Sequence, residues 1–173
     1  MSKGLPRSTS RGAPQRQEII KQTITIRDLP VTVDGATGVG FGSAVAGDFP
    51  EGNILFLGAV SYIQATGPTS ASLGDTWNGD YGFGTTPAGD ATITGADIDI
   101  IGSTPIGPAV AEASPRTRGT SVTATNAAVL DNTDGSLEIN LNLLVDDADI
   151  GADDLVFTVN GELHLSYIVL GDD

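Results

Sequence analysis

The chain of 173 residues contains no cysteine, one histidine, one methionine and one tryptophan. Without cysteine it can form neither disulfides nor thiolate metal sites. Its single histidine, His164, excludes a metal centre built from several imidazoles of one chain. We therefore expect stability to come from packing, hydrogen bonding and association with other chains, with no metal and no cofactor.

Long hydrophobic runs are also missing. No apolar run approaches the ~20 residues that a membrane-spanning helix needs. The longest, residues 54–62, contains Gly58 and Ser61 and predicts a buried strand. The positive charges near the N-terminus are not followed by an apolar segment, so this end does not resemble a secretory signal. We expect synthesis in a cytoplasm and no membrane partner.

Charge is divided unevenly along the chain. Residues 1–27 hold six of the eight basic residues against one carboxylate, Glu18, a net charge of +5. Residues 28–173 hold two arginines against 21 carboxylates, a net charge of −19. Such an asymmetry bears on partners and solubility rather than on fold. It predicts a basic arm on an acidic body.

The arm, residues 1–21, is rich in Pro, Gly, Ser and Arg and cannot bury enough apolar surface to offset the entropy of ordering. We expect it to be disordered in isolation and to order on an acidic surface that it does not itself supply. Its scattered cations lack aromatic neighbours, so no specific nucleic-acid partner is expected. The candidate binding residues of the arm and the strand after it are Lys3, Arg7, Arg11, Arg16, Lys21 and Arg27.

The body is predicted to be all-β, because 23 glycines and 9 prolines accompany apolar blocks rich in Val, Ile and Thr. The clearest alternation of apolar and polar residues covers residues 136–145. Its apolar positions are Leu137, Ile139, Leu141 and Leu143, and its polar positions are Glu138, Asn140 and Asn142. This pattern predicts a strand with one buried and one wet face.

Further strands are predicted along the rest of the body, residues 22–173, which we interpret as one domain. Asn160-Gly161 predicts a tight hairpin between two of them, because both central residues of a type I′ turn need positive φ. The further ranges are 22–27, 53–66, 91–101, 121–130, 155–160 and 162–170. Seven or eight strands separated by turns predict a β-sandwich or a jelly-roll-like body with an extended basic N-terminal arm.

Few residues of this sequence could form a catalytic site. Alternation within residues 162–166 places His164 opposite Leu163 and Leu165, which favours a structural residue on the polar face of a strand over a catalytic base. Composition alone permits a Ser-His-Asp triad, but no Gly-x-Ser-x-Gly pattern positions a nucleophile. We expect no enzymatic activity, and a hydrolase is the least favoured function.

Two patterns are similar to ligand-binding loops. An acidic cluster after residue 145 offers oxygen ligands for calcium, but it lacks the spacing of an EF-hand, so a solvated acidic turn is favoured. The same holds for residues 131–135. The cluster consists of Asp146, Asp147, Asp149, Asp153 and Asp154. Glycine-rich residues 38–42 and 82–84 open no helix and supply no lysine, which favours flexible turns or close backbone packing over phosphate binding.

Residues 66–90 are dense in turn signals and include three aromatic residues, Trp77, Tyr81 and Phe83. Trp77 and Tyr81 flank Asn-Gly-Asp and form a candidate platform for stacking on a sugar. A local mini-core or a subunit contact is the favoured interpretation. All three aromatics are retained as a candidate loop contact.

An acidic, cysteine-free β body with a basic arm and no catalytic constellation resembles the decoration or cement proteins of tailed-bacteriophage heads. Residues 42–55, 97–105, 141–148 and 169–173 are similar in texture to structural proteins of marine phages. The resemblance implies a virion protein on the capsid exterior, bound to the major capsid protein, often as a homotrimer, that stabilises the shell. The alternative is a carbohydrate- or receptor-binding module of a phage head or tail fibre, with residues 77–83 as its site.

Overall fold

The computed structural model describes residues 18–35, 39–121, 129–146 and 149–171. Within these ranges the regular structure consists of β-strands and one short 3-10 turn, η1 (Gly95–Asp97), which confirms the all-β prediction. The strands are β1 (Ile20–Val33), β2 (Gly40–Asp48), β3 (Asn53–Thr66), β4 (Gly79–Gly84), β5 (Ile101–Ile106), β6 (Thr117–Thr120), β7 (Val129–Leu130), β8 (Glu138–Val145) and β9 (Leu155–Gly171). No helix in the described part of the chain is long and apolar enough to span a membrane.

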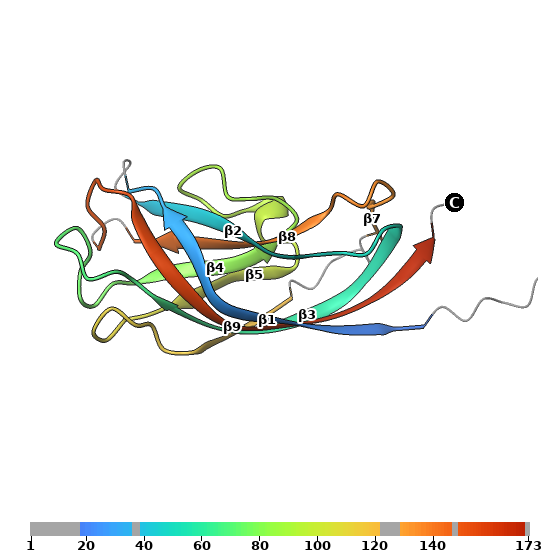
Figure 1. Cartoon of the computed structure of the whole chain (residues 1–173), viewed down its shortest axis with the longest axis horizontal. Helices are drawn as coiled ribbons and strands as arrows, with labels where there is room; N and C mark the ends of the chain where they lie inside the picture. The colour runs from blue at the N-terminus through green and yellow to red at the C-terminus, as the bar shows by residue number, and fades with distance from the viewer. Residues whose placement is uncertain (1–17, 36–38, 122–128, 147–148, 172–173) are drawn as a thin grey trace, which may run out of the picture.

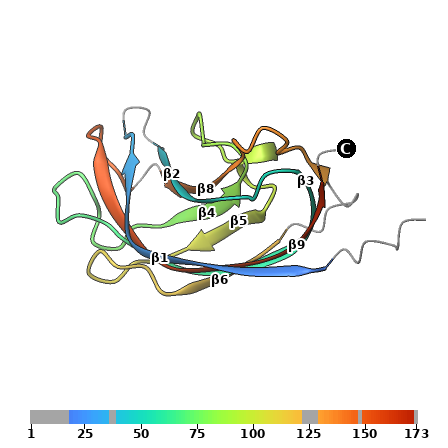
Figure 2. The same cartoon turned by 45° about the vertical axis from the view of Figure 1, so that its right-hand side comes forward.

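Two antiparallel sheets pack face to face as a sandwich (Figure 1, Figure 2). The first sheet has the order β1-β9-β3-β6, with β7 paired to β3, and the second has the order β2-β8-β4-β5. The first sheet is longer, and its β3 and β9 curve beyond the second sheet at the right of Figure 1. The start of β1 lies at this same end.

The strand pairing is nested, as in a long hairpin that has been rolled up. β1 pairs with β9, β2 with β8, β3 with β6 and β4 with β5, and successive pairs alternate between the two sheets. This order is that of a jelly roll. Of the two architectures compatible with the sequence pattern, the topology therefore selects the jelly roll.

The core lies between the sheets, and the alternation in β8 predicted part of it correctly. Ile139, Leu141 and Leu143 are buried against the first sheet. The prediction that the other face of β8 is wet is correct for Glu138, which is exposed, and wrong for Asn140 and Asn142, which are buried. Residues 85–100, which include η1, cover this outer face.

Asn142 anchors the covering segment through three hydrogen bonds to its backbone. Its Nδ2 donates to the carbonyl oxygens of Thr86 at 3.0 Å and Asp97 at 2.7 Å, and its Oδ1 accepts from the N–H of Ala88 at 2.8 Å. Two glycines of β4 leave room for the segment. A Cβ at Gly82 would lie 2.5 Å from Ile98 Cγ2, and one at Gly84 would lie 2.1 Å from the Ala96 oxygen. Of the two explanations offered for residues 82–84, flexible turns or close packing, the structure supports close packing.

Two predicted elements are wrong. Residues 91–100 form a loop and η1, and β5 begins only at Ile101. The hairpin predicted at Asn160-Gly161 does not exist, because β9 runs through both residues and pairs with β1 on one side and β3 on the other. Gly161 instead has φ 157°, and a Cβ there would lie 2.1 Å from the Tyr62 oxygen. Of the strand predicted over 121–130, residues 122–128 lie outside the described ranges.

Candidate binding face

The outer face of the first sheet gathers the basic side chains. Lys21, Arg27, Arg116 and Arg118 are the lysines and arginines of the described ranges, and all four are exposed. Lys21 and Arg27 belong to β1, Arg118 belongs to β6, and Arg116 directly precedes β6. The outer face follows from alternation, since Ile63 and its neighbours in register face the core.

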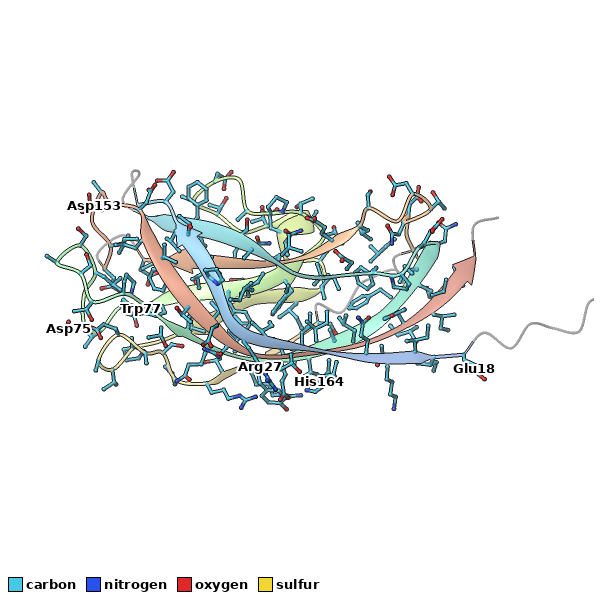
Figure 3. All side chains as sticks on the ribbon, in the orientation of Figure 1. Glu18, Arg27, Asp75, Trp77, Asp153 and His164 are labelled. Atoms are coloured by element: carbon cyan, nitrogen blue, oxygen red, sulfur yellow. The ribbon has the colours of Figure 1, made fainter. Side chains whose placement is uncertain are left out.

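His164 of β9 lies in the middle of this face, among polar and aromatic side chains. Its Nδ1 is 3.0 Å from Thr23 Oγ1, and its Nε2 is 3.3 Å from Glu162 Oε2. Its ring meets Tyr62 edge-on, with the ring centroids 6.3 Å apart. These contacts orient the imidazole on an open sheet surface, on the polar face where the sequence pattern predicted it. Figure 3 shows His164 and Arg27 on the same side of the sheet.

The two arginines near β6 cluster around Tyr62. The guanidinium carbon of Arg116 lies 5.8 Å from the centroid of the Tyr62 ring, a cation–π contact. Arg118 is the cross-strand partner of Tyr62, which in turn pairs with Glu162 of β9. Cross-strand neighbours of this kind lie close enough to interact. We call Lys21, Arg27, Arg116 and Arg118 the cationic face; His164 lies among them.

Few carboxylates accompany the cationic face. Glu162 lies within it, and Asp28 lies at its edge, where the Asp28 carboxylate accepts a hydrogen bond from Asn160 Nδ2 at 3.1 Å. Most of the other described carboxylates lie on loops or on the second sheet, as Asp75 and Asp153 do at the far left of Figure 3. The body is therefore electrically two-sided.

The candidate binding residues of the arm divide between two regions. Lys3, Arg7, Arg11 and Arg16 lie outside the described ranges. Lys21 and Arg27 lie on β1, an edge strand of the first sheet. Figure 3 places Glu18, the first described residue, just before the start of β1. The arm therefore continues from the sheet that carries the cationic face, a relation that sequence alone gave no means to find.

The candidate loop contact at the three aromatics is wrong. Trp77, Tyr81 and Phe83 each have 0% exposure and belong to the core. Trp77 packs edge-on against Phe157 with centroids 5.1 Å apart, and its Nε1 donates to the Glu112 carbonyl oxygen at 2.9 Å. Burial raises the pKa of Tyr81. The rings of all three residues pack inside the core, which agrees with the mini-core interpretation.

The acidic turns use their carboxylates to bind neighbouring backbone and hydroxyl groups. Asp149 Oδ2 accepts from the Asn78 N–H at 2.6 Å, and Asp153 Oδ2 accepts from Ser72 Oγ. Asp134 Oδ1 accepts from Ser136 Oγ at 2.7 Å, which lowers the pKa of Asp134. Asp147 lies outside the described ranges, and the described ranges hold no cluster of three or more metal-ligating side chains. These contacts are those of acidic turns.

A shallow depression of about 350 Å3 adjoins the cationic face. It forms where β3 bulges between Phe56 and Gly58. Its lining residues are Leu57, Gly58, Ala59, Val60, Ser121, His164 and Ser166. Its lining carries one titratable side chain, His164, and is otherwise apolar or hydroxylated.

Comparisons with known proteins identify no family for this chain. No protein-family model and no curated protein matches the chain. Among solved structures, the chain is similar to one from the cryo-EM structure of mud crab tombus-like virus, over 93% of this chain and 94% of that one. The sequence identity is 12% and the TM-score 0.40. At this level the comparison assigns neither a family nor a function.

Proposed function

We propose that this protein is a virion structural protein that binds the outside of a phage capsid and stabilises the shell without catalysis. The observation that carries the proposal is the cationic face, which includes Lys21, the last residue of the basic arm. A chain of net charge −14 would be repelled by an acidic surface in most orientations. The cationic face is the side that such a surface attracts, so it orients the molecule.

The arm extends this attraction. Lys3, Arg7, Arg11 and Arg16 add four cations to the chain before β1, on a segment whose composition suits ordering upon binding. The partner is the major capsid protein. Association of the body as a homotrimer would present three arms and three cationic faces at once, which raises avidity without new kinds of contact.

The jelly-roll topology is compatible with this role, since the fold is used by viral capsid domains as well as by lectins and cupins. That support is an analogy of fold. The alternative, a carbohydrate- or receptor-binding module, loses its aromatic platform because Trp77, Tyr81 and Phe83 are buried. The decoration role is therefore favoured over the binding module.

Labelling of intact virions tests the role directly. Virions purified from the natural source are treated with gold-conjugated antibody raised against residues 18–173. We expect gold on the outside of intact heads. Labelling only after disruption would indicate an internal or shell-forming protein, and labelling of tail fibres would indicate the binding module. Either result would overturn the decoration role.

Charge variants then test the binding surface. Removal of residues 2–17, or the double change Arg27→Gln with Arg118→Gln, is expected to lower retention on heads depleted of the protein. Asp75→Asn is the matched control, because it changes one exposed charge on a distant loop. The loss should be larger at low ionic strength, since 0.1 M salt already screens charges beyond ~10 Å. Wild-type retention of both variants would place the attachment elsewhere.

A further inference from the structure

The outer face of the first sheet changes character where the sheet extends beyond the second one. In its middle the outward side chains are polar, for example Thr23 and His164. Towards the end, Ile168 of β9 lies opposite Leu55 of β3, which lies opposite Val129 of β7. This row crosses three strands without a polar side chain. We call Ile19, Leu55, Leu57, Val129, Ile168 and Leu170 the apolar end.

Several of these side chains are strongly exposed. Ile19 is 58% exposed, Val129 53%, Leu57 46% and Leu170 36%. The opposite face of the same strands is packed, since Phe56 and Tyr167 are buried and Phe49 contacts Tyr167 edge-on at 5.7 Å. The apolar end is thus a second apolar surface on strands whose other side already contacts the core. Contiguous patches of this kind mark interaction sites.

Charge indicates what covers the apolar end. Two copies of a chain with net charge −14 repel one another wherever their carboxylates meet. On β9, the outward positions from Ser166 to Leu170 carry no carboxylate, and the nearest outward one is Glu162. At the start of β1, Lys21 is accompanied by Glu18, so this part of the rim is close to neutral. Along β1 and β9, two copies can therefore approach without large repulsion.

Shape supports the same occupant. The depression of about 350 Å3 lies directly beside exposed Leu57, so a projecting apolar side chain and a space that admits one are neighbours on the same face. In a two-fold contact the same patch of both copies meets, so Leu57 of one copy and the depression of the other belong to one interface. We propose that the apolar end is a homotypic interface, covered by the apolar end of a second copy of this chain.

Oligomeric state tests the interface on the isolated full-length chain. Sedimentation velocity is expected to show wild-type protein associating, with the mass deciding between two and three copies. Leu57→Asp and Val129→Asp should weaken association by at least about tenfold in Kd, because each buries a carboxylate against apolar groups. Val156→Asp is the matched control, since Val156 is 51% exposed on the outer face of β9 at its opposite end.

Folding of each variant is checked by circular dichroism and by its urea midpoint at a concentration where wild type is dissociated. Both should match wild type because the changed side chains are exposed. A wild-type monomer at about 100 µM would overturn the inference. So would a folded Leu57→Asp variant that associates as wild type does. Neither result bears on binding to heads, which the antibody and retention experiments measure separately.

Cross-linking gives a second readout, because the chain has no cysteine. Leu57→Cys introduces a single thiol at the proposed interface, and Val156→Cys introduces one outside it. Under mild oxidation, disulfide-linked pairs are expected from Leu57→Cys at a concentration where Val156→Cys stays single-chain. Equal cross-linking of the two variants would contradict a homotypic contact at the apolar end.

Discussion

Asn142 connects the core strand β8 to the segment that covers its outer face, and its removal should be costly. Asn142→Ala deletes three hydrogen bonds to the backbone of Thr86, Asp97 and Ala88. Each such bond contributes about 0.5–1.5 kcal/mol net. The Asn142 side chain is fully buried, and its three backbone partners lie in part-buried hydrogen bonds. We expect a loss of about 3–4 kcal/mol in the free energy of unfolding.

Urea unfolding with Ser103→Ala as control measures this loss. Ser103 is an exposed residue of β5 in the same sheet, and its change should stay within about 0.5 kcal/mol. Hydrogen exchange at the Ala88 amide provides a local readout, since that amide donates to Asn142 Oδ1. A loss below about 0.5 kcal/mol for Asn142→Ala, or unchanged protection at Ala88, would refute the anchoring role.

Asn142→Asp keeps the shape of the side chain and removes only its hydrogen-bond donor, so it tests the contribution of the Nδ2 group. It replaces the Nδ2 group with an oxygen facing two carbonyl oxygens, at 3.0 Å and 2.7 Å in the wild type. Ionisation of the new carboxyl in this buried site is unfavourable, so its folded pKa should lie above its unfolded value. The variant should then lose stability as pH rises through that folded pKa. A variant as stable as wild type at pH 7 would contradict the donor assignment.

Three further predictions concern the core and the titration of the body. Leu141→Asp places an unpaired carboxylate in the buried face of β8 and should abolish cooperative unfolding followed by circular dichroism; a native-like transition would overturn this facing. Trp77, the single tryptophan, is fully buried, so acrylamide should barely quench its fluorescence before unfolding, and quenching in the native state as strong as in urea would contradict its burial. Burial raises the pKa of Asp99, although Thr85 donates to it. Its folded pKa exceeds the unfolded one, so the stability of wild type relative to Asp99→Asn should fall as pH rises from the unfolded pKa through the folded pKa, and a rise would contradict the direction.

Local patterns predicted much of the fold, because they follow from strand geometry. Alternation in residues 136–145 identified Ile139, Leu141 and Leu143 as core, and the density of turns predicted the sandwich class. Local patterns failed where a distant segment was involved. The burial of Asn142 depends on residues 85–100 folding across β8, and an amide side chain carries the same signal whether its partner is water or backbone.

The same limit explains the hairpin that is absent. Asn160-Gly161 favours a turn in isolation, but β9 pairs along its length with β1 and β3, and these two ladders outweigh a local preference. Gly161 is needed for close approach to the Tyr62 oxygen rather than for a turn. The aromatics of residues 77–83 show the reverse case, where a turn-rich segment contributes side chains to the core.

Sequence by itself determined the all-β class, the basic arm on an acidic body and the positions of the strongest core strand, because composition and period-2 alternation are local properties. Tertiary structure alone decided the jelly-roll order and the candidate site. Lys21 and Arg27 are separated from Arg116 and Arg118 by about 90 residues. Only the pairing of β1, β9, β3 and β6 places them on one face, since cross-strand register is set by contacts between distant segments.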